Sequence, residues 1–197
     1  MSETLSRIRE LAAECGKPLG EVLNVARLSY VTGVSELDVQ TLLDGGTVPE
    51  PEPEPMVRER VRFLYEHHKT EAGERRDQAD IAAAIAQTTT WTKRLVEGLA
   101  KPNILVGAKL TQFYGVAPTF LTDSPADAVN RELQQVLFDL QVEADPSKAL
   151  ADLGVRHISG RSPQMNEPSL AELAKMVANI ASDLDELKRM QNPEGER

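Results

Sequence analysis

The chain has 197 residues, of which 41% are hydrophobic and 27% are charged, and this balance excludes a disordered polypeptide. No apolar run approaches the roughly 20 residues that cross a bilayer, and the N-terminus lacks the apolar core of a secretory signal. The single cysteine, Cys15, cannot form an internal disulfide and has no second thiol for a metal site. The sequence therefore predicts a cytoplasmic globular protein, with no membrane partner.

The net charge of −9 argues at first against a nucleic-acid partner, because affinity for phosphate groups comes mostly from Lys and Arg. Its distribution along the chain changes that argument. Residues 1–55 carry 4 basic and 10 acidic side chains, residues 56–123 carry 10 and 8, and residues 124–197 carry 8 and 13. Only the middle third is net basic, which is compatible with locally focused DNA binding.

In chain order, we expect a helical module over 1–46, a linker over 47–55, a second helical domain over 56–123, a C-terminal helical region over 124–190 and a tail over 191–197. Apolar residues recur at spacings of three and four, and no run alternates apolar and polar residues as a strand does. The sequence thus predicts an all-α fold. "TVPEPEPEP" (47–55) alternates Pro and Glu, which predicts an extended spacer that holds the two modules apart.

A repeat with a constant offset of 53 residues crosses this linker. Apolar, Gly and Pro positions agree together, which indicates two copies of one small helical unit. The matched pairs are Arg7 and Arg60, Ile8 and Val61, Arg9 and Arg62, Leu11 and Leu64, Ala26 and Ala79, Leu28 and Ile81, Ser35 and Thr88, Val39 and Thr92, Leu42 and Leu95, Gly45 and Gly98, and Pro49 and Pro102.

Both copies have the spacing of a helix-turn-helix. The first places Ser29 at the helix crossing and Gly33 in the turn, as this motif requires. The second keeps a small residue, Ala82, at the crossing but has Ala86 where the turn glycine is expected and Thr92 where a branched apolar residue is expected. The first copy therefore fits the motif better.

Only the second copy has the chemistry for DNA. "QTTTWTKRLVEG" (87–98) combines four Thr, one Trp, one Lys and one Arg just before a glycine that ends the helix. This composition is typical of a helix that contacts nucleic acid, and a solvated surface helix is the other interpretation. The matching stretch of the first copy carries Glu36 and Asp38 at the positions of Thr89 and Trp91, which would repel phosphate and favour contact with a protein partner.

Residues 56–123, from "MVRERVRFLYEHH" through "QADIAAAIAQTTTWTKRLVEGLAKP" to "FYGVAPTFLTD", resemble the lambda-repressor-like XRE helix-turn-helix family. With "NRELQQVLFDL", "GVRHIS" and a terminal amphipathic helix, the resemblance extends over residues 124–190 to actinobacterial nucleoid-associated regulators of the EspR type. The resemblance implies an XRE-type domain followed by a C-terminal dimerisation helix. Residues 1–55 lie outside it.

The resemblance also implies DNA-contacting positions. Gln78 opens the second helix of the motif, Thr89 and Thr90 open the recognition helix, and Arg94 lies one turn further on. Independently of the family, Thr can contact phosphates or thymine methyl groups and Arg can pair with guanine, while Lys93 and Lys101 suit phosphates. Trp91 is interpreted either as a packed anchor or as a ring against the DNA backbone.

No metal or cofactor site is expected. The three histidines His67, His68 and His157 have no acidic or thiol neighbours at the spacing of metal ligands, so we interpret them as surface or helix-end residues. The sequence also contains no glycine-rich phosphate loop, paired-carboxylate motif or nucleophile motif, so an enzyme is not expected.

The C-terminal helix is the second strong signal. "PSLAELAKMVANIASDLDELKRM" opens with a capping box, and its leucine-rich stripe alternates steps of three and four, as in a short coiled coil. The other interpretation is a helix that packs on its own domain. We expect a homodimer whose seam contains Leu170, Leu173, Val177, Ile180, Leu184 and Leu187.

The function that these patterns favour is a homodimeric regulator of transcription, or a nucleoid-associated protein, that binds double-stranded DNA with the recognition helix in the major groove. The alternative is an adaptor whose tandem helical modules bind another protein.

Overall fold

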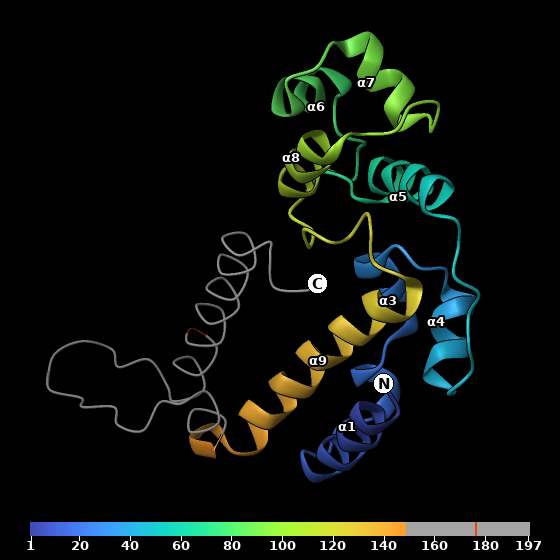
Figure 1. Ribbon diagram of the computed structural model, residues 1–197. Helices are drawn as coiled ribbons and strands as arrows, with labels where there is room; N and C mark the ends of the chain where they lie inside the picture. The colour runs from blue at the N-terminus through green and yellow to red at the C-terminus, as the bar shows by residue number, and fades with distance from the viewer. Residues whose placement is uncertain (149–175, 177–197) are drawn as a thin grey trace, which may run out of the picture. The chain divides into compact units, whose positions relative to one another are not determined.

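The computed structural model of the chain describes residues 1–148 and Met176, and within that part it is entirely helical, with no strand. The expected all-α class is confirmed for these residues. The helices are α1 (Ser2–Glu14), α2 (Leu19–Val22), α3 (Val25–Thr32), α4 (Glu36–Leu43), α5 (Pro53–His67), α6 (Gln78–Ile85), α7 (Thr89–Val96), α8 (Ile104–Tyr114) and α9 (Pro125–Ala144) (Figure 1).

The contacts divide the chain into two compact units, and this division differs from the expected boundaries at residues 46 and 123. One unit combines Met1–Val22 with the chain from Leu133 onward, and the other is Leu23–Glu132. The expected module over 1–46 is therefore split, because α1 and α2 belong to the first unit whereas α3 and α4 belong to the second. Helix α9 contributes its two halves to different units.

In the first unit, α1 and the second half of α9 each bury an apolar stripe. The buried side chains are Leu5, Ile8, Leu11 and Ala12 of α1 and Leu133, Val136, Leu140 and Val142 of α9. Polar contacts also reach α9: Gln134 Nε2 donates to Thr4 Oγ1 of α1 at 2.9 Å, and Lys17, in the turn after α1, forms an ion pair with Glu143. The apolar face of α1 therefore has a partner more than a hundred residues away in sequence.

In the second unit, helices α5 to α8 share one hydrophobic core. Its members are Val61, Leu64, Ile81, Ile85, Leu95, Val96, Val106, Leu110, Tyr114, Phe120 and Leu121. Helix α3 reaches this part of the unit through its C-terminal end, where a Cβ atom added at Gly33 would lie 2.7 Å from Cζ of Phe120. The imidazole of His68 also stacks on the ring of Tyr30.

The Pro-Glu segment differs from the expected spacer in extent and in effect. Residues 47–52 are not helical, but α5 already begins at Pro53, so the last three residues of the expected linker are helical. Proline fits the first turn of a helix, because the N–H groups of that turn have no partner within the helix and the lack of one costs nothing. The segment also does not hold the two copies apart, since α3 lies against His68 of α5 and against Phe120.

The two helix pairs repeat the same local structure at the offset of 53 residues. Helices α3 and α4 have the same lengths as α6 and α7, and their bounds differ by that offset. Each first helix ends on a left-handed residue, Gly33 with φ 67° and Ala86 with φ 55°. Each second helix has a hydroxyl N-cap, Ser35 or Thr88. The repeated sequence pattern thus corresponds to repeated geometry.

Candidate nucleic-acid interface

The turn between α6 and α7 is fixed by local hydrogen bonds at both helix ends. Ala86 adopts φ 55° and ψ 48°, and its N–H donates to the carbonyl oxygens of Ala82 and Ala83. The side chain of Thr88 then caps α7 by accepting a hydrogen bond from Trp91 N at 3.3 Å. Ala86 therefore adopts the left-handed conformation that Gly33 adopts in the first copy, although a Cβ atom makes this conformation unfavourable.

Helix α7 has a buried face and an exposed face with different chemistry. Thr92, Leu95 and Val96 are buried in the core of the second unit. The exposed side chains are Thr89, Thr90, Lys93 and Arg94. This exposed face carries hydroxyl and basic groups, and α7 itself contains no carboxylate.

Trp91 lies between the two faces. It is partly buried and packs against the hydrophobic core of α5 to α8. Of the two interpretations of this residue, the packed anchor is the one that matches its position. A large amphipathic side chain in this place fixes the rotation of α7 about its own axis, and with it the direction of the exposed face.

Gln78 and Lys101 already have partners in the structure. Gln78, the first residue of α6, is half-buried, and its Nε2 donates to the hydroxyl of Tyr65 at 3.2 Å. Lys101 follows α7, and its Nζ lies 3.0 Å from a carboxylate oxygen of Glu54. This pair is exposed, and such pairs contribute only about 0 to 1 kcal/mol, so Lys101 can exchange Glu54 for another anion.

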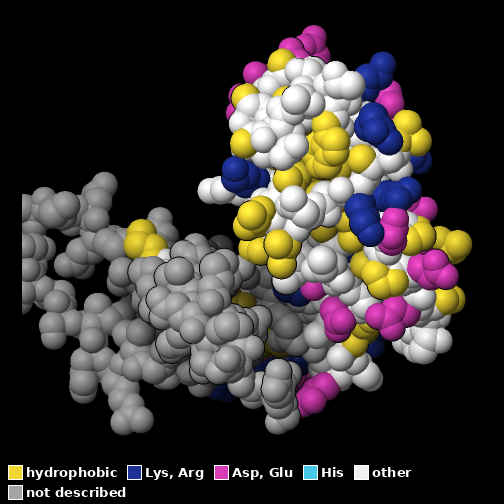
Figure 2. Space-filling view, turned by 45° about the horizontal axis from the view of Figure 1, so that its top comes forward, with side chains coloured by type: hydrophobic (Ala, Val, Ile, Leu, Met, Phe, Trp, Pro, Cys, Tyr) yellow, Lys and Arg dark blue, Asp and Glu magenta, His cyan; other side chains and the backbone are white. Residues whose placement is uncertain are grey.

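Two basic side chains near α6 and α7 were not among the DNA-contacting positions expected from the sequence. The guanidinium of Arg75 lies 5.6 Å from the centroid of the Tyr65 ring, the same tyrosine that accepts the hydrogen bond of Gln78. Arg62 donates from Nη2 to the carbonyl oxygen of Glu97 at 2.8 Å and so holds the end of α7. Arg75 could have been found from the sequence, because two consecutive arginines, Arg75 and Arg76, stand just before the N-cap of α6. In Figure 2, several Lys and Arg side chains lie along the side where Figure 1 shows α5 and α7.

The corresponding helix of the first copy presents the opposite charge. Helix α4 carries Glu36 and Asp38 in its first turn and is followed by Asp44 at its C-cap. The side chain of Leu37, between the two acidic residues, is 77% exposed. The same backbone geometry thus presents an acidic, partly apolar surface on α4 and a basic one on α7.

Several expectations concern residues that the structure does not describe or does not bring together. The expected dimer-seam residues Leu170, Leu173, Val177, Ile180, Leu184 and Leu187 lie outside the described residues, as does His157. Within residues 1–148, no three His, Cys, Asp or Glu side chains are grouped so that they could hold a metal ion. None of the described helices is long and apolar enough to span a membrane.

His68 lies at a helix end, which was one of its two expected positions, but it is not on the surface. It is buried at the end of α5, where its Nε2 lies 3.1 Å from the carbonyl oxygen of Tyr30. Its neighbours are aromatic rings on α3, α5 and α8 and Phe120 in the turn after α8, so its apolar faces are covered on several sides. His67 is exposed, as expected.

No family model matches the sequence, and no curated protein or solved structure matches it either.

Proposed function

We propose that the protein binds double-stranded DNA as a homodimer, with α7 in the major groove, and acts in the cytoplasm as a regulator of transcription or a nucleoid-associated protein. The observation that carries this proposal is the exposed face of α7. An N-capped helix follows a left-handed turn and presents Thr89, Thr90, Lys93 and Arg94, with no carboxylate before Glu97.

Each group on this face has a role that its chemistry suits. The guanidinium of Arg94 can pair with the O6 and N7 atoms of guanine, which is the commonest base-specific contact in the major groove. Thr89 and Thr90 lie in the first turn of α7, where the helix dipole also favours a phosphate. Lys93, Lys101 and Arg75 supply the positive charge for the DNA backbone, which positions the protein without reading sequence.

Gln78 contributes at the start of α6. Because its Nε2 donates one N–H to Tyr65, its second N–H is left for a phosphate, and its amide oxygen can accept from a water. Tyr65 also lies under the guanidinium of Arg75, so one side chain positions two of the proposed backbone contacts.

The resemblance of residues 56–190 to XRE-type and EspR-type regulators supports the same proposal. A seam through Leu173, Val177, Ile180, Leu184 and Leu187 gives a two-fold dimer, and a two-fold dimer places two α7 helices about one DNA turn, or a multiple of it, apart. Such a protein requires neither a cofactor nor a catalytic group.

A second candidate is a protein-binding adaptor, and one specific observation favours it. Leu37 projects from α4 with 77% of its surface exposed, beside Glu36. An exposed leucine in an acidic surface is more typical of a protein contact than of a DNA contact. The two candidates are compatible if α4 binds a protein while α7 binds DNA.

A salt titration of the full-length protein with duplex DNA tests the proposal. A dimer in which Arg75, Lys93 and Lys101 each contact a phosphate makes about six such contacts, so its affinity should fall roughly a thousandfold between 50 and 200 mM KCl. Fluorescence anisotropy with a labelled duplex measures this directly. Absence of binding at 50 mM KCl, or binding that does not depend on salt, would favour the adaptor instead.

A further inference from the structure

An open pocket of about 470 Å³ lies within the Leu23–Glu132 unit, away from the exposed face of α7. Its apolar wall includes Val34 from the α3–α4 turn, Val48 from the Pro-Glu segment, and Met56 and Phe63 from α5. Small-molecule sites in proteins typically have volumes of about 300 to 1,000 Å³ and are mostly apolar with a few polar groups. The pocket therefore has the size and wall chemistry of a ligand site.

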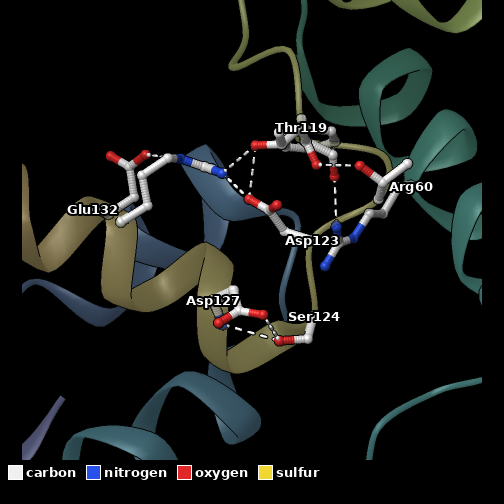
Figure 3. A network of polar contacts seen from close by, with 9 residues as sticks. Arg60, Thr119, Asp123, Ser124, Asp127 and Glu132 are labelled. Atoms are coloured by element: carbon white, nitrogen blue, oxygen red, sulfur yellow. Dashed lines mark hydrogen bonds and ion pairs between the residues drawn. The ribbon is translucent and has the colours of Figure 1, made fainter. Parts of the chain in front are cut away.

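One of its polar groups is a buried cation. Arg60 lines the pocket and is only 3% exposed. Its Nη1 donates to the carbonyl oxygen of Phe120 at 2.6 Å (Figure 3). Its guanidinium lies 6.0 Å from the centroid of the Phe120 ring. Among the described residues, the Arg60 side chain makes no other hydrogen bond and no ion pair. Most of its five N–H donors are therefore left for a further acceptor.

The nearby carboxylate of Asp123 does not serve as that acceptor. Asp123 forms an ion pair with Arg131 and accepts a hydrogen bond from Thr119 Oγ1 at 2.8 Å, in the polar network at the start of α9 (Figure 3). Burial lowers the pKa of Arg60, while the charge of Asp123 raises it. A buried guanidinium without a direct anionic partner is unfavourable, and an anion bound in the pocket would relieve that cost.

The same pocket also contains negative charge. Glu59, next to Arg60 on α5, is exposed, and its carboxylate makes no hydrogen bond or ion pair within residues 1–148. Asp38 is half-buried and accepts from Ser35 Oγ at 2.7 Å. A simple anion would be attracted by Arg60 but repelled by these two carboxylates. A simple cation would be attracted by the carboxylates but repelled by Arg60.

We propose that this pocket binds a small zwitterion with an apolar side chain, that is, an apolar α-amino acid. The α-carboxylate pairs with Arg60, the α-ammonium group pairs with Glu59 and faces Asp38, and the side chain packs on Val34, Val48, Met56 and Phe63. This assignment uses all three kinds of group that line the pocket. It does not depend on DNA binding by α7.

Isothermal titration calorimetry on the full-length protein tests the proposal with three matched probes. L-leucine carries both charges, 4-methylpentanoate lacks the ammonium group, and L-leucinamide lacks the carboxylate. We expect L-leucine to bind and each of the other two to bind at least roughly tenfold more weakly, since each loses one charge-assisted pair. Failure of L-leucine to bind, or equal binding of 4-methylpentanoate and L-leucine, overturns the proposal.

Variants at the pocket separate recognition from folding. Glu59→Gln changes an exposed side chain, so the fold should persist while the affinity for L-leucine falls roughly tenfold and that for 4-methylpentanoate does not fall. Glu66→Gln, which removes a carboxylate from the same helix outside the pocket, is the matched control and should leave both affinities unchanged. Equal effects of the two variants would contradict the assignment of Glu59.

A third variant tests the position of the ligand without changing a charge. Val48 lies in the non-helical segment before α5 and lines the pocket. Val48→Trp should fill the space beside the apolar wall and abolish binding of L-leucine, while the circular dichroism spectrum stays helical. Unchanged binding in this variant would show that L-leucine occupies another site.

Discussion

The imidazole of His68 lies flat on the ring of Tyr30, with the ring centroids 4.3 Å apart and the planes inclined by 13°. Its Nε2 is 3.1 Å from the carbonyl oxygen of the same tyrosine. Because a carbonyl oxygen can only accept, Nε2 carries the proton and donates. This contact joins the end of α5 to α3 and depends on a buried imidazole.

The stability of the protein should therefore depend on the charge of His68. Burial is the main cause that lowers its pKa, His67 and Arg76 lower it further, and the hydrogen bond to Tyr30 acts in the opposite direction. In the pH range between the lowered pKa and about 6.5, the unfolded chain binds more protons at this site than the folded chain does. The free energy of unfolding should thus be highest above pH 6.5 and fall on acidification, by at most about 1.4 kcal/mol per pH unit from this group.

Urea unfolding at pH 7.5, 6.5 and 5.5 measures this dependence, and His68→Phe should flatten the slope between the last two values. His67→Phe is the matched control, because His67 is exposed. Its replacement should leave the pH dependence of the unfolding free energy nearly unchanged. Identical slopes in the wild type and in His68→Phe would show that other groups cause the dependence.

Thr92→Val should stabilise the protein. Thr92 is fully buried on the inward face of α7, and its Oγ1 has no hydrogen-bond partner among the described residues. Valine has nearly the same shape, and it removes the cost of the unpaired hydroxyl, about 1 to 3 kcal/mol. A rise in the urea midpoint without a change in slope would be the expected result.

Thr32→Val is the control for this change. Thr32 is as deeply buried, but its Oγ1 donates to the carbonyl oxygen of Leu28 at 2.6 Å. The same substitution there should destabilise the protein by about 1 kcal/mol. If both variants move the midpoint in the same direction, the hydrogen-bonding argument is wrong.

Ala86→Gly should also stabilise the protein, by about 0.5 to 1 kcal/mol. The left-handed conformation of Ala86 brings its Cβ close to backbone atoms, whereas glycine adopts it without this cost. The reverse change in the first copy, Gly33→Ala, should destabilise by about 1 to 3 kcal/mol, because the new Cβ would also meet the Phe120 ring. Thermal unfolding of both variants beside the wild type checks the two signs.

Arg94→Ala should weaken DNA binding and relax base preference, whereas Lys93→Ala or Lys101→Ala should weaken binding about equally on all sequences. A base-edge contact carries roughly 1 to 3 kcal/mol of discrimination, and a phosphate contact carries none directly. Selection from a random duplex library, followed by anisotropy titrations, measures both quantities. Arg27→Ala removes an exposed arginine from α3 instead and should change neither. Unaltered affinity and preference in Arg94→Ala would place the recognition surface elsewhere.

Replacing Ile180 and Leu184 with lysine should produce a monomer and much weaker binding to a two-site operator. Each half-site would then bind alone, without the effective concentration that a dimer supplies. Sedimentation velocity measures the oligomeric state. Lysines at Ser182 and Glu186, on the opposite side of the predicted helix, change charge without touching the predicted seam and should leave the dimer intact. A dimer that survives the first double change has its interface at another surface.

The helices of the two repeated pairs follow from local sequence. Ser35 and Thr88 are typical N-caps, Gly33 marks the end of α3, and positions 92 and 95 of α7, which match Val39 and Leu42 at the offset of 53, are buried. These features depend on interactions within a few residues, so the sequence alone predicts them. The left-handed Ala86 follows from the repeat rather than from its own residue type.

Other features depend on contacts between distant residues, and the sequence does not predict them. The apolar stripe of α1 is compatible with many partners, so its burial beside α9 could not be inferred from spacing. Arg60 occurs in a basic segment and reads as a surface side chain, yet it is buried against Phe120. The Pro-Glu segment has the composition of a spacer, but composition does not reveal that Tyr30 of α3, before this segment, packs on His68, after it.

The first compact unit is built from the two ends of the described chain, and this arrangement imposes an order on its formation during synthesis. The 110 residues of Leu23–Glu132 must be translated between α1 and the half of α9 that covers it. At about 5 to 20 residues per second, this takes roughly 6 to 22 seconds. During that interval Leu5, Ile8 and Leu11 leave the ribosome without their native partners, while the central unit already has its own helices available. The nascent chain should therefore complete its middle first and close its N-terminal end last, with α1 accessible to chaperones until then.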